Sequence, residues 1–530
     1  MQNKNIDSIV ELYHLVGQPL YIGEFDNDII NTLYNYLLSN RKDHYSANQR
    51  IAIVQECDDV YDLFGNNLGH TVGHLQKFLT ELDITNCFVH IITGNQNIAD
   101  ELVQAKELFS NDQTNIEYSI IDLPFEKRII KRESFCLRAW KHLYVDTRAN
   151  LRLCCEADPI DVLGNVRESN VLDVINSDKF NEARLKMLAN ETVSGCRLCY
   201  DKEDIGQISQ RQEYNTNWKH EIENALKNTN ADGSVNDWVP VTTHVALNNT
   251  CNLKCRTCSG LSSSILAQEE KKLLNYTFNY DNQLKNKEKE NVLSNIIQTL
   301  QSTQRITFAG GEPLLQDEHY AILNHLLSNN LTDIRLNYNI NGTTLSHKQH
   351  DVCELWNKFS NVRVRFSIDG MDDVFNYIRH GADWKQVKNN FLTVKTRCPQ
   401  VELGINSCVS FLSIESLLEL QQTWHNDGIL DIGKHHLDYM LENNDFYSLQ
   451  TLPLHHKTRI ARKIDKHCQW LNQQKSSLEA DWQDMKDYML AEDKQYVLNS
   501  LYADLSLRDQ YRKENFFKVY PQFVDIFNNL

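Results

Sequence analysis

The 530-residue chain has few of the residues that interrupt regular structure, with only 8 prolines and 19 glycines. It contains no run of 18 or more apolar residues, and its first residues lack a basic segment followed by an apolar one. We therefore expect neither a membrane span nor a secretory signal, and we predict a cytoplasmic protein. Basic residues are also in deficit, and the net charge of −17 argues against a phosphate-binding surface and hence against nucleic acid as a partner.

Cysteine is abundant instead, with 14 residues. In a reducing compartment, clustered cysteines serve as metal ligands more often than as disulfides. Two groups stand out, one within residues 136–199 and one within residues 251–258. The remaining six are interpreted as buried small hydrophobes or incidental thiols: Cys57, Cys87, Cys353, Cys398, Cys408 and Cys468.

The second group has the spacing C-x3-C-x2-C, formed by Cys251, Cys255 and Cys258, directly after a strand-like run at 244–248. Three thiolates this close cannot all form disulfides with each other, and soft thiolates select iron–sulfur clusters and zinc. Three ligands on a four-iron cluster leave one iron open to a substrate or cofactor. Zinc is the alternative, but it needs a fourth ligand, and no histidine or cysteine follows closely after Cys258.

A second motif, Phe-Ala-Gly-Gly-Glu-Pro-Leu at 308–314, follows another strand-like run. Together the two motifs resemble the radical S-adenosylmethionine (SAM) superfamily. The resemblance implies that the three cysteines hold the catalytic 4Fe-4S cluster and that SAM is bound by Ala309, Gly310, Gly311 and Glu312. The glycines let backbone approach a ligand because no Cβ intrudes, and Glu312 is acidic where the cationic amine is bound. Thr257 departs from the family, which often has an aromatic residue there.

Residues 131–217 resemble the cysteine-rich auxiliary-cluster domain called SPASM, in its shorter one-cluster "twitch" form. The likeness rests on a cysteine near a tryptophan, a hairpin ending in Cys154-Cys155, a helix at 171–188 and a closing C-x2-C. It implies an auxiliary 4Fe-4S cluster held by Cys136, Cys154, Cys196 and Cys199. Neighbours on a strand point to opposite faces, so Cys154 is preferred over Cys155. A four-cysteine zinc site is the alternative.

The whole chain is predicted to be α/β: an N-terminal α/β domain (1–130), the twitch domain (131–217), a linker (218–238), a partial (β/α)6 radical SAM barrel (239–440) and a helical C-terminal cap (441–530). Barrel strands are expected at 243–249, 304–309, 333–340, 361–368, 401–408 and 429–435, with helices at 262–274, 317–328, 347–359, 384–396 and 414–425. Active residues belong at the carboxyl ends of such strands. By resemblance Asn341, Ser367 and Asp369 join the cofactor site there, although Asn-Gly and Asp-Gly pairs are also ordinary turns.

The two ends of the chain carry weaker signals. Strands at 50–55, 87–93 and 116–121, with helices at 70–82 and 98–109, predict a three-stranded parallel sheet that serves as a docking module or as a scaffold. Gly65 and Gly69 do not complete a phosphate-binding fingerprint. Near the other end, His455 and His456 are interpreted as surface residues, because adjacent histidines on a helix face different ways.

By resemblance the protein is an enzyme whose reduced cluster cleaves SAM to a 5′-deoxyadenosyl radical, which takes hydrogen from a substrate. A peptide or protein substrate is the leading hypothesis, because the auxiliary domain resembles those of ribosomal-peptide maturases. The alternatives are a small molecule (a sugar, nucleoside or amino acid) and a non-catalytic iron–sulfur scaffold or redox sensor. A reductant such as flavodoxin or ferredoxin is expected as a partner, and nucleic acid and membrane are not.

Overall fold

The computed structural model describes residues 134–527, except 168, 205–207, 247, 274–285 and 440–444, together with four strands in the first 133 residues. The chain divides into two compact units, Met1–Glu133 and Ser134–Leu530.

The first unit contains one parallel sheet of four strands in chain order, β1 (Leu20–Ile22), β2 (Arg50–Gln55), β3 (Asn86–Thr93) and β4 (Asn115–Asp122). The three predicted strands are confirmed. The additional strand β1 is only three residues long, too short to give a periodic signal. The helices expected at 70–82 and 98–109, and the turn around Gly65 and Gly69, lie outside the described residues, so the role of this unit stays a prediction.

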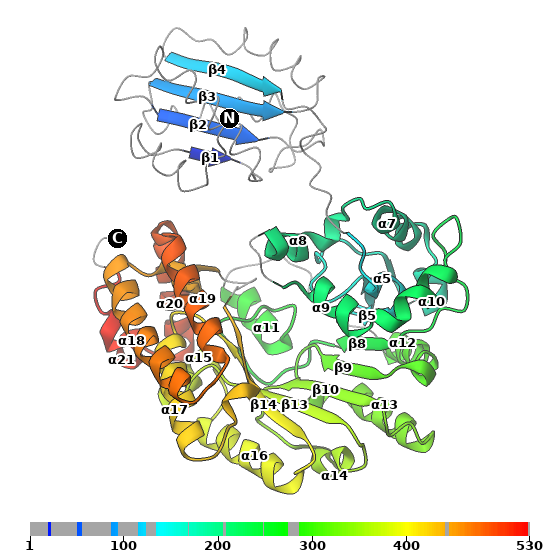
Figure 1. The fold of residues 1–530 in the computed structure, drawn as a ribbon. Helices are drawn as coiled ribbons and strands as arrows, with labels where there is room; N and C mark the ends of the chain where they lie inside the picture. The colour runs from blue at the N-terminus through cyan, green and yellow to red at the C-terminus, as the bar shows by residue number, and fades with distance from the viewer. Residues whose placement is uncertain are drawn as a thin grey trace. The chain divides into compact units, whose positions relative to one another are not determined.

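A single nine-stranded sheet organises the second unit (Figure 1). Six of its strands are parallel and adjacent in chain order: β8 (Thr242–Ala246), β9 (Arg305–Ala309), β10 (Arg335–Ile340), β13 (Val362–Ser367), β14 (Glu402–Cys408) and β15 (His435–Asp438). This is the predicted partial barrel. Burial alternates along β13, so that one face packs on helices and the other faces the barrel interior.

The prediction for the last barrel strand is wrong. The run at 429–435 was expected to be a strand, but β15 begins only at His435. The Asp431 carboxylate accepts the Gly433 backbone N–H and starts a short 3-10 turn (η6, Ile432–Lys434), while Leu430 and Ile432 are buried in the core. The apolar run therefore anchors a loop, and the strand begins after it.

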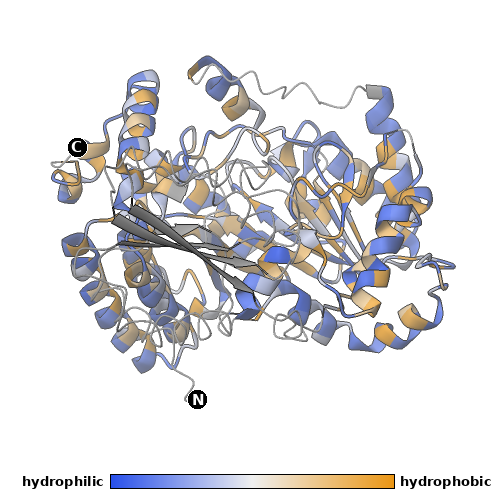
Figure 2. Cartoon of the chain, turned by 90° about the horizontal axis from the view of Figure 1, so that it is seen from above, coloured by the Kyte–Doolittle hydropathy of each residue, from blue (hydrophilic) through white to orange (hydrophobic). Residues whose placement is uncertain are grey.

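Helices cover the outer face of the sheet through aromatic contacts. Phe308 of β9 packs on His319 of α13 (Asp317–Ser328), Tyr338 of β10 on Trp356 of α14 (Val352–Trp356), and Phe366 of β13 on Phe391 of α16 (Trp384–Arg397). With α11 (Ser264–Leu273) and α17 (Ile414–Asn426), these correspond to the five predicted helices, although α14 is shorter than the predicted 347–359. The hydropathy colouring shows hydrophilic and hydrophobic residues interspersed along the helices (Figure 2).

Within the described part of the barrel segment, two helices were not predicted: α12 (Asn286–Gln298) and α15 (Asp372–Ile378). The second matters for the site, because the segment that follows it packs against the cysteine loop.

The cysteine-rich segment extends the same sheet. Strand β5 (His142–Val145) pairs in parallel with β8, and β6 (Asn150–Arg152) and β7 (Gly164–Asn165) continue outward as antiparallel strands. The predicted helix at 171–188 is interrupted at Asn176 and forms α6 (Val171–Ile175) and α7 (Asp178–Leu188). The segment expected as a linker, 218–238, carries a short helix, α10 (Ile222–Lys227).

The C-terminal segment is helical, as predicted, with α18 (Leu454–Gln473), α19 (Leu478–Ala491), α20 (Leu498–Arg512) and α21 (Phe516–Val519). None of the helices in the described part of the chain is long and apolar enough to cross a membrane.

Candidate iron–sulfur and cofactor site

The loop that carries Cys251, Cys255 and Cys258 runs from the carboxyl end of β8 to the start of α11. Its backbone is fixed by the last residue of α15 and the segment after it. Lys254 donates its N–H to the carbonyl of His380 (2.9 Å), and Arg256 donates to that of Ile378 (2.8 Å). Burial raises the pKa of Cys255 to about 12 and that of Cys258 to about 11. All three side chains are half-buried.

The Gly-Gly-Glu motif at the end of β9 packs directly on this loop. Gly311 donates its N–H to the carbonyl of Asn248 (2.9 Å), and Glu312 donates to that of Thr250 (2.7 Å). A Cβ on Gly310 would lie 2.5 Å from the Asn248 carbonyl oxygen, and one on Gly311 would lie 2.1 Å from that of Thr250. The sequence argument was that these glycines admit a ligand. In the structure, they allow close contact between two segments of the chain itself.

Glu312 is 1% exposed, and its carboxylate is oriented by backbone. Its Oε2 accepts the N–H of Asn341 (2.6 Å), and its Oε1 accepts that of Leu314 (3.1 Å). Burial raises the pKa of Glu312 to about 7. Asn341 follows β10, and its Nδ2 donates to Asn252 Oδ1 (2.9 Å) and lies 4.0 Å from Cys251 Sγ. The structure therefore brings Glu312 and Asn341 together beside the cysteine loop.

Asp369 is fully buried beyond β13 and binds within the protein. Its Oδ1 accepts the N–H of Cys408 (2.8 Å), and its Oδ2 lies 2.8 Å from Nε of Arg379. Nη1 of Arg379 lies 3.9 Å from Cys255 Sγ, and this cation lowers the pKa of that thiol against the larger effect of burial. Ser367 ends β13 opposite Asn406 of β14.

Arg379 is a site residue that the sequence reasoning missed. It follows the unpredicted helix α15 and belongs to no strand-end motif. A basic residue just after a short helix is a common pattern, so the sequence held no distinctive signal for it.

A buried ion-pair network ties the cysteine loop to the C-terminal helices. Arg256, between two of the cysteines, is fully buried, and its guanidinium lies 3.8 Å from the ring centroid of Tyr377. Its Nη2 contacts Asp509 of α20 and lies 2.7 Å from Glu514 Oε2. Glu514 also pairs with His380 Nδ1 at 2.7 Å. The C-terminal helices therefore form ion pairs with both the cysteine loop and the segment after α15.

The other cysteine group gathers behind the β5–β6 hairpin. Cys136 precedes α5 (Arg138–Lys141), Cys154 follows β6, and Cys196 and Cys199 lie in η2 (Ser194–Cys196) and α8 (Arg197–Asp204). Burial, followed by the nearby thiols of Cys136, Cys154 and Cys199, raises the pKa of Cys196. Each of these four is therefore close enough to influence at least one other electrostatically.

Cys155 has different surroundings. Burial raises its pKa, and the charged groups that modify it most are Arg138, Glu156 and Arg152. Its side chain lines a cavity of about 650 Å³, although its thiol also raises the pKa of the neighbouring Cys154.

That cavity, called here the inter-cluster cavity, extends from the hairpin to the Gly-Gly-Glu motif. Its lining includes Tyr144, Arg152, Cys155, His244, Ala309 and Gly310. His244 of β8 and Tyr144 of β5 are paired across the sheet and meet edge-to-face at 5.1 Å. Burial lowers the pKa of His244 to about 3, so this imidazole is neutral at physiological pH.

The spacing of the thiols distinguishes clusters from single zinc ions. Zinc–sulfur bonds of about 2.3 Å would hold the sulfurs of a tetrahedral site roughly 3.8 Å apart. Among the described residues, no three of these cysteine sulfurs lie within 4.8 Å of one another. In a four-iron cluster each thiolate binds a different iron, so the sulfurs stand farther apart. Neither group therefore has the spacing of a single tetrahedral zinc site.

The structure thus defines an iron–sulfur protein with a partial parallel barrel. The radical SAM superfamily profile matches residues 245–407, and that of SPASM, an iron–sulfur cluster-binding domain, matches residues 136–200. The chain therefore contains a radical SAM domain and a SPASM domain. Its cofactors are a 4Fe-4S cluster with SAM in the barrel and auxiliary iron–sulfur in the SPASM domain. No curated protein matches the chain.

Several solved structures are distantly similar. The structure of anSMEcpe with bound AdoMet and Cp18Cys peptide is 17% identical, with 44% of this chain and 60% of that chain covered and a TM-score of 0.28. Streptococcus suis SuiB bound to precursor peptide SuiA is 14% identical, with 57% and 65% covered and a TM-score of 0.30. TYW1 with a lysine-pyruvate adduct is 15% identical, with 43% and 73% covered and a TM-score of 0.24. The chain spans less than two thirds of the first two proteins.

Proposed function

We propose that this radical SAM enzyme takes hydrogen from a peptide or protein substrate that enters the inter-cluster cavity. The observation that carries the proposal is the position of this cavity, which meets the Gly-Gly-Glu motif at Gly310 and the auxiliary cysteine segment at Cys155. A substrate held there lies within reach of both cofactor regions. Its volume of about 650 Å³ lies within the range of roughly 300–1,000 Å³ usual for ligand pockets.

The charges around the cavity favour a peptide. Acidic and basic side chains both occur in its lining: Asp146, Arg148, Arg152, Glu156, Asp158, Arg197 and Asp201. A peptide offers side chains of both signs and a backbone that donates and accepts hydrogen bonds, so it can satisfy such a surface along its length.

In the barrel, Cys251, Cys255 and Cys258 are assigned to the catalytic cluster. When bound and reduced, the cluster and SAM supply a 5′-deoxyadenosyl radical that takes a hydrogen atom from a substrate carbon. Arg379 supports the thiolate form of Cys255 electrostatically from 3.9 Å. Asp369 is assigned the task of holding Arg379, and Ser367 lies at the strand end where the resemblance places the cofactor.

Ala309, Gly310, Gly311, Glu312 and Asn341 are assigned to SAM. The two oxygens of a carboxylate offer about four acceptor sites, and the two backbone contacts of Glu312 occupy two of them. The remaining lone pairs are available to the cationic amine of SAM. A pKa of about 7 means that such a cation would draw Glu312 into its ionised form.

In the auxiliary segment, Cys136, Cys154, Cys196 and Cys199 are assigned to one 4Fe-4S cluster. The mutual electrostatic influence of these thiols supports the choice of Cys154, and the cavity position of Cys155 supports its exclusion. We assign electron acceptance from the substrate radical to this cluster, with flavodoxin or ferredoxin reducing the barrel cluster.

The test is anaerobic incubation of the reconstituted enzyme with reductant, SAM and deuterated substrate pools, analysed by mass spectrometry. One pool contains peptides that carry both acidic and basic residues, and the other contains sugars, nucleosides and free amino acids. We expect deuterium to enter 5′-deoxyadenosine from the peptide pool alone. Deuterium arriving only from the small-molecule pool would contradict a peptide substrate.

A matched pair of variants connects the result to the cavity. Arg148→Gln removes a half-buried charge from the cavity lining, and Arg363→Gln removes a half-buried charge from β13 outside this lining. We expect the first to lower peptide-dependent deuterium transfer and the second to leave it nearly unchanged. If both variants change deuterium transfer from the peptide equally, the peptide does not react in this cavity.

A further inference from the structure

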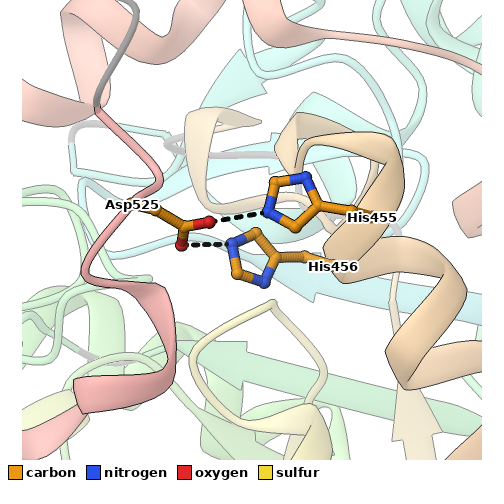
Figure 3. A group of neighbouring side chains, drawn as sticks. All are labelled: His455, His456 and Asp525. Atoms are coloured by element: carbon orange, nitrogen blue, oxygen red, sulfur yellow. Dashed lines mark hydrogen bonds and ion pairs between the residues drawn. The ribbon is translucent and has the colours of Figure 1, made fainter.

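Three side chains outside the iron–sulfur region converge near the start of α18. His455 and His456 come from the first turn of this helix, and Asp525 comes from the segment after α21 (Figure 3). The sequence predicted surface histidines that face apart. The structure shows His456 buried and both rings directed to the same carboxylate, with their centroids 4.1 Å apart.

The distances suit a shared metal ion. Nε2 of His455 lies 2.9 Å from Asp525 Oδ2, and Nε2 of His456 lies 2.9 Å from Oδ1. The three ligand atoms lie within 4.8 Å of one another, the only such trio of histidine, cysteine or acidic side chains among the described residues. Zinc–ligand bonds of about 2.0–2.2 Å in a tetrahedral site would place ligand atoms roughly 3.4 Å apart, which is inside this limit.

We propose that His455, His456 and Asp525 bind one divalent transition-metal ion, with zinc the best fit. Two imidazoles and a carboxylate form a donor set of borderline softness, which suits zinc. Calcium and magnesium prefer oxygen ligands throughout. No cysteine belongs to the trio, so the site is chemically distinct from the iron–sulfur ligands.

The surroundings leave room for the ion. A cavity of about 850 Å³ lies beside the trio, with His455 and Asp525 in its lining, so water can complete the coordination. Arg459 also lines this cavity, but its Nη1 pairs with Glu415 Oε2 at 2.8 Å. Its charge is therefore partly neutralised.

A bound ion would link the segment after α21, which carries Asp525, to α18. His456 packs edge-to-face on Phe523 at 5.0 Å, and Phe523 contacts Phe411 and Phe516. Tyr520 of the same segment packs on Tyr377, whose ring makes the cation–π contact with Arg256 of the cysteine loop. Metal binding by His455, His456 and Asp525 should therefore stabilise the C-terminal helices that form ion pairs with the cysteine loop.

The experiment measures zinc binding by the cluster-loaded protein in anaerobic equilibrium dialysis with radioactive zinc. The wild type is compared with His455→Ala and Asp525→Asn. The His455 side chain is 60% exposed and that of Asp525 is 40% exposed, so neither change opens a core cavity. We expect the wild type to bind one zinc ion per chain. Each variant should bind zinc at least roughly tenfold more weakly, since losing even an outer-shell partner lowers metal affinity 10–100-fold.

His425→Ala is the matched control, because this half-buried histidine lies in the last turn of α17 and pairs only with Gln474 Oε1 among the hydrogen bonds described for its ring. It should bind zinc like the wild type. Zinc should also raise the thermal unfolding temperature of the wild type and of this control, and not that of Asp525→Asn. Equal zinc affinity in all four proteins, or equal thermal shifts, would overturn the proposed site.

Discussion

The carboxylate of Glu514 lies 2.7 Å from the guanidinium of Arg256, although 258 residues separate them in the chain. Arg256 stands between two cysteines of the proposed catalytic cluster and is fully buried. Removing one partner of a buried ion pair is costly, because the remaining charge loses compensation that water cannot replace. The C-terminal extension is thus part of the structure that shapes the cysteine loop.

We predict that Glu514→Gln lowers the free energy of unfolding by about 1–3 kcal/mol and speeds chelator-driven iron loss from the barrel cluster. The auxiliary iron should be lost at its wild-type rate. Denaturant titration and timed iron release measure the two effects. Glu492→Gln serves as the control, because Glu492 is 54% exposed and its 3.5 Å pair with Lys494 is on the surface. Equal iron release in the two variants would contradict the role assigned to Glu514.

The adjacent cysteines of the hairpin should behave differently. The reconstituted wild type is expected to hold about eight irons in two cubes. Cys154→Ser should lose about half of this iron, whereas Cys155→Ser should keep it, because Cys155 faces the cavity. Iron analysis and electron paramagnetic resonance distinguish the two variants. Iron loss in Cys155→Ser alone would reverse the assignment.

Glu312→Gln removes a buried charge that faces the proposed amine of SAM and keeps the side-chain shape. Hydrogen bonds to charged groups contribute about 1.5–3 kcal/mol, so SAM affinity should fall roughly tenfold or more. Iron content should stay the same, because Glu312 is not a cluster ligand. Equilibrium binding of SAM to the cluster-loaded protein measures this change, and unchanged affinity would mean that Glu312 does not contact the amine.

His435 makes stability depend on pH. Its Nε2 lies 2.8 Å from Ser407 Oγ and its Nδ1 2.8 Å from Gln421 Nε2, and burial, followed by His436 and His467, lowers its pKa to about 3. The unfolded chain, with a histidine pKa of about 6.5, takes up this proton first as the pH falls. The neutral His435 therefore makes its full contribution to the free energy of unfolding above pH 6.5. As the pH falls from 6.5 towards 3, this free energy decreases by up to about 1.4 kcal/mol per pH unit.

His435→Gln should therefore unfold more easily at pH 7 but lose less further stability between pH 6.5 and pH 5. Urea titrations across this interval give the slope. His425→Gln, a change at a half-buried histidine of the adjacent α17, should keep the wild-type slope. A slope in His435→Gln equal to that of the wild type would assign the acid sensitivity to other groups.

Local patterns predicted the parts of the site that lie next to each other in the chain. The strand before Cys251 and the strand before Gly310 are short strand-like runs, and in a parallel barrel their ends must meet. The sequence could not show that β5 joins β8 or that Arg256 pairs with Glu514, because these contacts depend on packing between distant segments. Arg379 escaped notice for the same reason, since only the fold brings it to Cys255.

The last prediction separates the two clusters by function. The pair Cys196→Ala and Cys199→Ala removes two auxiliary ligands and leaves Cys251, Cys255 and Cys258 intact. If the auxiliary cluster accepts the electron of the substrate radical, this variant should still form 5′-deoxyadenosine while the modified peptide disappears. The reason is that SAM cleavage depends on the barrel ligands, whereas product formation needs an acceptor.

A purely structural role would give a different result, because β5 of the auxiliary segment pairs with β8, the strand that leads into the cysteine loop. Loss of the auxiliary ligands would then loosen this strand and lower both activities together, with earlier thermal unfolding. Measuring 5′-deoxyadenosine, peptide product and melting temperature on the same preparation distinguishes the two roles. Parallel loss of both activities in a protein that melts earlier would contradict electron acceptance and assign the auxiliary cluster a structural role.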